Sequence, residues 1–152
     1  MIGDGNGWVK CAQGHRHWGL HGAAGLLVRH SDVSTGRTYV LLQHRAAWSH
    51  HGDTWGIPGG ARDSHESPEQ AAMREAVEEA GVAVDLLLVR QSVTDDHGGW
   101  SYVTVLAEAT AMTPLRARNF ESVELRWVPV EDVHQLPLHP GFAITWPVLR
   151  ET

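Results

Sequence analysis

Apolar and polar residues follow two different periods along this chain, one typical of β-strands and one typical of an α-helix. Two runs rich in apolar and β-branched residues, 22–30 and 38–45, flank the polar segment 31–37 and predict a β-hairpin. Glycine and aspartate dominate the segment 95–99, which predicts a turn. Further strands are predicted around 86–89, over 100–109 and over 123–130.

A helical signal occupies the centre of the chain, after a short strand and a glycine loop at 55–60. Ser67 predicts the N-cap, Pro68 fits the first helical position, and Gln70 completes a capping box with Ser67. Gly81 predicts the C-terminal end, because glycine readily adopts the left-handed conformation that ends helices. The sequence therefore predicts a helix between Ser67 and Gly81.

The two sides of this predicted helix differ in chemistry. Glu75, Glu78 and Glu79 share one side, at spacings that bring side chains together. Like charges so placed cost about 0.2–0.5 kcal/mol per pair. Arg74 is the only cation nearby in the sequence. At about 100° per residue, the apolar and small residues fall on the opposite side: Ala72, Met73, Ala76, Val77 and Ala80.

The acidic side allows two interpretations. An acidic run on a helix is usually a solvated face. The alternative is a metal site, because Mg²⁺ and Mn²⁺ prefer oxygen ligands and would neutralise the clustered carboxylates. Gly59 and Gly60 favour the metal, since paired glycines let the backbone approach a ligand closely and offer it a carbonyl oxygen.

The ends of the chain predict less regular structure. Residues 1–20 are rich in glycine and predict an irregular arm that covers the surface, with Trp8 and Trp18 packed on the domain. A terminal helix is predicted near 141–150, although Pro147 weakens it. A predominance of strands with one or two helices indicates an α+β domain.

Composition and charge narrow the classes of function. A length of 152 residues suits a single domain over 1–152, and neither a membrane span nor a signal peptide is visible. One cysteine excludes an internal disulfide framework and fits a reducing compartment, which predicts a cytoplasmic protein. The formal net charge of −6 argues against a polymeric nucleic acid as partner. A small anionic ligand remains compatible if a metal screens its charge.

The central stretch spells out the pattern G-x5-E-x7-R-E-U-x-E-E-x-G-U, in which U is apolar. Its fixed positions are filled in order by Gly60, Glu66, Arg74, Glu75, Ala76, Glu78, Glu79, Gly81 and Val82. This pattern resembles the Nudix box, and the preceding W-G-I-P-G resembles the usual approach to it. The resemblance is specific over the box and looser over the rest of the chain. It implies an α/β/α sandwich with a mixed central sheet, against which the box helix packs.

The resemblance also implies an activity. Members of the Nudix family hydrolyse a phosphoanhydride bond in nucleotides and nucleotide conjugates, with Mg²⁺ or Mn²⁺ as the cofactor. By this resemblance Glu75, Glu78, Glu79 and the main-chain carbonyl of Gly59 form the metal site. Arg74 is expected to hold the glutamates in place by ion pairing. Glu66 is expected to steady the loop and the helix.

The general base has two groups of candidates. In some family members it is a box glutamate, here Glu75 or Glu79; in others it is an acid in the loop before the last strand. That loop offers Glu121, with Glu124 as a weaker candidate. Both are otherwise interpreted as solvated loop acids, because glutamate is usually exposed.

The substrate is expected to be a small nucleotide. Arg45, at the end of a predicted strand, suits phosphate binding, since a guanidinium binds phosphate through two parallel hydrogen bonds. Trp48, Trp100 and Tyr102 could stack on a nucleobase, although large aromatic residues more often belong to the core or its rim. The particular nucleotide and the oligomeric state stay open, with a homodimer among the alternatives.

Two other functions share the expected fold. A nucleotide sensor would bind without cleaving, but an intact box argues against it because a sensor does not need all three metal-site glutamates. An isopentenyl diphosphate isomerase would rely on a cysteine within a motif that this sequence lacks, since Cys11 lies in unrelated surroundings.

The arm carries Cys11, His15 and His17, with His21 just beyond, and such residues could form a zinc site. Their spacing differs from standard zinc motifs, and the 11 histidines of the chain are scattered enough to produce local groups. The sequence therefore favours a packing role for these side chains.

Overall fold

The computed structural model describes residues 3–49, 51–112, 115 and 122–152. The elements follow one another in this order: β1 (Trp8–Lys10), β2 (Arg16–Trp18), β3 (Ala23–Ser31), β4 (Thr38–Arg45), β5 (Trp55–Gly56), β6 (Gly59–Ala61), α1 (Pro68–Ala80), η1 (Val84–Leu86), β7 (Leu87–Asp96), β8 (Ser101–Ala109), β9 (Ser122–Pro129), η2 (Val130–Gln135) and α2 (Pro140–Leu149). Elements η1 and η2 are 3₁₀ helices.

A mixed sheet forms the middle of the molecule. Its main path runs β5-β4-β3-β8-β7, while β6 pairs with β3 and β9 pairs with β4. The central contact between β3 and β8 is parallel, and Leu26 lies opposite Val105. Strands β3 and β4 are antiparallel, with Arg29 opposite Val40, which confirms the predicted hairpin.

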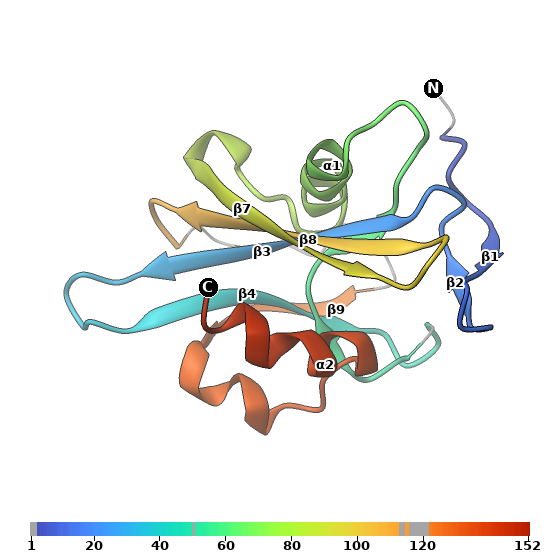
Figure 1. Ribbon diagram of the computed structural model, residues 1–152. Helices are drawn as coiled ribbons and strands as arrows, with labels where there is room; N and C mark the ends of the chain where they lie inside the picture. The colour runs from blue at the N-terminus through green and yellow to red at the C-terminus, as the bar shows by residue number, and fades with distance from the viewer. Residues whose placement is uncertain (1–2, 50, 113–114, 116–121) are drawn as a thin grey trace.

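Helices cover both faces of this sheet (Figure 1). Because successive side chains of a strand point to opposite faces, Leu26 and Val28 of β3 pack in the core beneath α1, whereas Leu27 packs in the core on the α2 side. Phe142 and Trp146 of α2 fill that second core. The predicted α/β/α sandwich with a mixed sheet is therefore confirmed.

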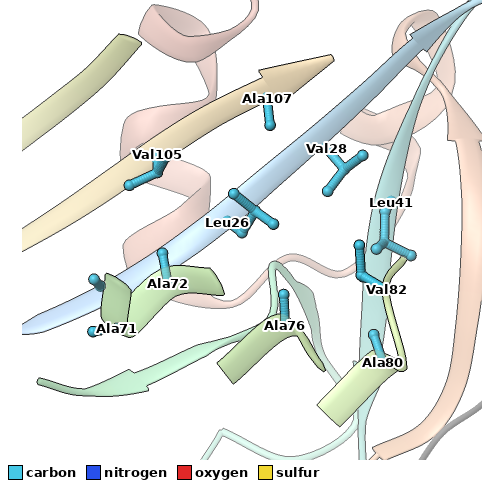
Figure 2. Close-up of a cluster of buried hydrophobic side chains, with 11 residues drawn as sticks. Leu26, Val28, Leu41, Ala71, Ala72, Ala76, Ala80, Val82, Val105 and Ala107 are labelled. Atoms are coloured by element: carbon cyan, nitrogen blue, oxygen red, sulfur yellow. The ribbon is translucent and has the colours of Figure 1, made fainter. Parts of the chain in front are cut away.

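Helix α1 begins and ends where its local signals predict. Ser67 Oγ accepts a hydrogen bond from the Gln70 amide at 3.1 Å, and Gln70 Oε1 accepts one from the Ser67 amide at 2.9 Å. Gly81 adopts a left-handed φ of 63°, so its backbone N–H reaches the Val77 carbonyl. Figure 2 shows the small side chains of the helix facing the sheet: Ala71, Ala72, Ala76 and Ala80. Small residues let the helix lie close to β3.

The prediction of an irregular arm is wrong. Strands β1 and β2 form a separate antiparallel hairpin in which Val9 lies opposite His17. Trp8 and Trp18 stack edge to face with ring centroids 5.2 Å apart, and both remain nearly half exposed instead of being buried on the domain. Backbone pairing across the hairpin outweighs the glycine-rich composition, because the glycines fall outside the two strands.

Two further boundaries differ from the prediction. Strand β7 begins near the predicted position but continues to Asp96, since it pairs with β8 along almost its whole length. The terminal helix α2 forms despite containing Pro147, because burial of Phe142, Trp146 and Leu149 compensates for the lost backbone hydrogen bond. Among the described residues, every helix is too short or too polar to cross a membrane.

Candidate active site

A cleft of about 610 Å³ opens beside the N-terminal part of β8 and the glycine loop. Its walls come from the β1–β2 hairpin, the end of β4, the loop between β5 and β6, helix α1 and the start of α2. The residues that line the cleft include Trp8, His17, Trp18, Arg45, Gly59, Gly60, Glu75, Glu79, Asp95, His97, Trp100 and Tyr102. A cleft of this size suits a nucleotide, since small-molecule sites typically enclose about 300–1,000 Å³.

Two glutamates of α1 lie directly against the glycine pair. Glu79 Oε2 accepts a hydrogen bond from the Gly59 amide at 2.9 Å. A Cβ at Gly60 would lie 2.6 Å from Glu75 Oε1, so only glycine leaves room for that carboxylate. Strand β6 thus brings backbone and two carboxylates together at the floor of the cleft.

Arg74 connects the helix to the loop that precedes it. Its Nε and Nη2 donate to the two oxygens of Glu66 at 2.9 and 2.7 Å, and Nη2 also donates to the Ala61 carbonyl at 3.1 Å. Its Nη1 donates to Glu75 at 3.0 Å and to Glu78 at 3.4 Å. The paired guanidinium lowers the pKa of the Glu66 carboxyl and the carboxylates raise the pKa of Arg74, so both groups are charged.

The three box glutamates differ in exposure, although the sequence predicted only that they share one side of the helix. Glu79 is 8% exposed, Glu75 is half-buried, and Glu78 is exposed. Burial raises the pKa of the Glu75 carboxyl, although Arg74 acts in the opposite direction. Glu75 and Glu79 line the cleft, whereas Glu78 is not among the described residues that line it.

The donor atoms of this site suit a hard divalent cation. Glu75 and Glu79 offer carboxylate oxygens beside the main chain of Gly59, and Mg²⁺ and Mn²⁺ prefer oxygen ligands. Glycine at position 60 lets the Glu75 carboxylate approach the main chain closely, since a Cβ there would lie 2.6 Å from Glu75 Oε1. The residues therefore fit the metal that the sequence predicted.

Arg45 and Tyr102 lie at the same cleft as the glutamates. Burial raises the pKa of the Tyr102 hydroxyl, and the nearby negative charge of Glu79 raises it further while Arg45 opposes it. A Cβ at Gly25 or Gly59 would collide with this hydroxyl. The Tyr102 hydroxyl is therefore packed tightly against the backbone at Gly25 and Gly59, while Tyr102 also lines the cleft.

The remaining residues that the sequence predicted to bind substrate or to act as the base lie in different environments. The Trp100 indole stacks on His17, with ring centroids 4.0 Å apart and planes 8° from parallel. Trp48 is 69% exposed. Glu124 is exposed and bonds to Arg126 at 2.8 Å. Glu121 lies outside the described residues, while Ser122, the next residue in the chain, pairs with Arg45 through the backbone.

Local sequence patterns assign no role in the site to Asp95 or His97, and they indicate His17 only as a possible zinc ligand. His17 comes from the arm, whereas Asp95 and His97 come from the end of β7 and the following turn. Burial and the neighbouring His97 and His15 lower the pKa of His17. Only the position of the hairpin relative to β7 brings these residues together, and local patterns do not encode that position.

Known proteins resemble this chain over nearly its whole length. A family model described as "NUDIX domain" matches residues 19–150. The chain is 53% identical over 154 residues to a protein of Mycobacterium tuberculosis (strain CDC 1551 / Oshkosh) named "Putative 8-oxo-dGTP diphosphatase 3", covering 97% of this chain and 70% of that protein. It is 45% identical over 147 residues to the "Nucleoside triphosphate pyrophosphatase/Nudix hydrolase fusion protein" of Bifidobacterium longum (strain NCC 2705), covering 94% of this chain but 30% of that one.

A solved structure is similar over nearly its whole length. The crystal structure of a Nudix hydrolase from M. smegmatis, RenU, superimposes with a TM-score of 0.90 at 52% sequence identity. The match covers 97% of this chain and 94% of that chain.

Proposed function

The chain belongs to the Nudix family and is a Nudix hydrolase, and from this premise we propose that it cleaves a phosphoanhydride bond of a nucleoside triphosphate. Water adds to phosphorus and the bond to the leaving phosphate oxygen breaks, which yields a nucleoside monophosphate and pyrophosphate. The observation that carries this proposal is the convergence of Glu75 and Glu79 on the Gly59–Gly60 backbone inside a nucleotide-sized cleft.

The acidic site is proposed to hold Mg²⁺ or Mn²⁺ through Glu75, Glu79 and the Gly59 carbonyl, with Glu78 as a further ligand. Bound there, such an ion neutralises phosphate oxygens and stabilises the charge that develops on them. Glu79 is positioned by the hydrogen bond that its Oε2 accepts from the Gly59 amide.

Proton removal from the attacking water is proposed for a carboxylate of the same site. Glu75 suits this role because burial raises the pKa of its carboxyl, which makes the carboxylate more basic than an exposed one. Glu121 is the second candidate base. Arg45 is proposed to bind the phosphate chain, since it lines the cleft together with both glutamates.

We propose a purine triphosphate with an oxidised base as the substrate. Support comes from the M. tuberculosis relative, whose name states 8-oxo-dGTP as its substrate. Further support comes from the aromatic side chains of Trp8, Trp18 and Trp100, which line the cleft and provide apolar surface for a base.

A hydrolysis screen with Mg²⁺ or Mn²⁺ tests this proposal. The panel contains 8-oxo-dGTP, dGTP, dATP, ADP-ribose and a diadenosine polyphosphate, and the products are identified by chromatography. We expect 8-oxo-dGTP to give the highest kcat/KM, with the monophosphate and pyrophosphate as products. Tight binding of a nucleotide without any product would instead support the sensor. Preference for a dinucleotide would contradict the proposed substrate but not the reaction.

A further inference from the structure

The proposed hydrolysis leaves one group of reactive side chains unused. Cys11, His17 and His97, which we call the hairpin cluster, bring their potential ligand atoms within 4.8 Å of one another. Cys11 is 5% exposed, and His17 Nε2 is buried without a hydrogen-bond partner among the described residues. Burying a polar atom without a hydrogen-bond partner costs free energy, so a ligand bound at this nitrogen would stabilise the folded chain.

The surroundings of the hairpin cluster hold its side chains in place. Asp95 Oδ2 lies 2.9 Å from His97 Nε2, a pairing that orients the imidazole and leaves its other nitrogen for coordination. The indole of Trp100 stacks on His17 at 4.0 Å and fixes the plane of that ring. Carboxylate–histidine pairs of this kind are the usual outer layer of a transition-metal site.

We propose that Cys11, His17 and His97 bind a divalent cation of the zinc class. One sulfur and two imidazole nitrogens are the donors that Zn²⁺ prefers, and three protein ligands leave a fourth position for water. In a tetrahedral zinc site the donor atoms lie about 3.5 Å apart. Side-chain rotations that move the donor atoms by about 1 Å would therefore complete the site. The carboxylates beside Gly59 offer only oxygen, which suits a different ion.

Such an ion would fasten the β1–β2 hairpin to the β7–β8 turn. At present the Ala12 amide donates to the Gly98 carbonyl at 2.7 Å across this contact. Trp8 and Trp18 of the same hairpin line the cleft. A metal in the hairpin cluster would therefore stabilise the wall of the cleft that carries Trp8 and Trp18.

The test uses Co²⁺ as a spectroscopic substitute for Zn²⁺ in the 152-residue chain after removal of metals with a chelator. Thiolate coordination gives a charge-transfer band that oxygen ligands cannot give, so the acidic site does not interfere. We expect this band to saturate at one equivalent of Co²⁺ and Zn²⁺ to displace it. Cys11→Ser should abolish the band, and His97→Ala should weaken Co²⁺ binding at least about 100-fold. Glu79→Gln should keep the band and the Co²⁺ affinity of the unchanged chain.

His15→Ala is the matched control, because His15 lies in the same hairpin, is exposed and stands outside the hairpin cluster. It should bind Co²⁺ as the unchanged chain does. Zn²⁺ should also raise the Tm of the unchanged chain and of His15→Ala but not of His97→Ala. The proposal is overturned if the unchanged chain shows no thiolate band, or if His97→Ala binds as tightly as His15→Ala.

Discussion

At the scale of single residues, Glu79 joins the box helix to the glycine loop through its hydrogen bond with the Gly59 amide. We expect Glu79→Gln to lower kcat at least about 10²-fold, because the amide cannot replace a carboxylate in the metal site. The fold should survive, since the glutamine carbonyl can still accept the hydrogen bond from the Gly59 amide. Steady-state kinetics with saturating metal, together with urea unfolding, measure the two effects. Unchanged turnover would show that Glu79 is not part of the metal site.

Glu66 is expected to act on stability, because it is buried and accepts two hydrogen bonds from Arg74. Glu66→Gln should reduce the free energy of unfolding at pH 7 by about 1.5–3 kcal/mol, the usual range for hydrogen bonds between charged groups. Glu124→Gln is the control, since the exposed pair of Glu124 with Arg126 should contribute less than about 1 kcal/mol.

The effect of Glu66 should depend on pH in a definite direction. Arg74 lowers the pKa of the Glu66 carboxyl in the folded chain, so the stabilisation is complete above the unfolded pKa of about 4.3. It is then lost as the pH falls through the folded value. The free energy of unfolding, measured in urea, should therefore be lower for Glu66→Gln than for the unchanged chain by the same amount at pH 6 and at pH 7. This difference should shrink below about pH 4.3. A constant difference at lower pH would contradict this assignment.

At the scale of elements, the close packing of α1 on the sheet positions the carboxylates. Ala76 is fully buried between the helix and β3. Ala76→Leu should cost about 1–3 kcal/mol of stability through overpacking. It should also lower kcat, since a shift of about 1 Å at a catalytic site costs roughly 10²-fold.

Val77→Leu is the control for this substitution, because Val77 lies on the same helix but outside the buried core. It should change both stability and kcat less than Ala76→Leu does. Thermal unfolding and steady-state kinetics of the two variants provide the comparison. Equal kcat values would show that the helix does not need this close approach.

Elements were predictable where their determinants are neighbours in sequence. The caps of α1 depend on Ser67, Gln70 and Gly81, all within or next to the helix, and the structure confirms each of them. The β1–β2 hairpin was missed, because its strands are short and its backbone pairing leaves little trace in a glycine-rich sequence. The same distinction holds for the site. The box predicted its acidic residues, whereas the proximity of His17 to His97 depends on contacts between segments that are distant in sequence.

At the scale of the whole molecule, the cleft combines segments from both ends of the chain. Strand β9 returns to β4 so that Ser122 pairs with Arg45, which lines the cleft. The sequence-based proposal that Glu121 assists catalysis predicts that Glu121→Gln lowers kcat about 10²–10⁴-fold, with a smaller change in KM. A loss of less than threefold would leave the box glutamates as the source of the base.

We propose that the carboxylates beside Gly59 and Gly60 hold a divalent metal that hydrolysis requires. The most direct measurement is the initial rate of 8-oxo-dGTP hydrolysis by the unchanged chain, recorded by product chromatography in Mg²⁺ and again in excess EDTA. We expect monophosphate and pyrophosphate in Mg²⁺, no product in EDTA, and full recovery of the rate when Mg²⁺ is restored. Undiminished hydrolysis in excess EDTA would contradict this proposal.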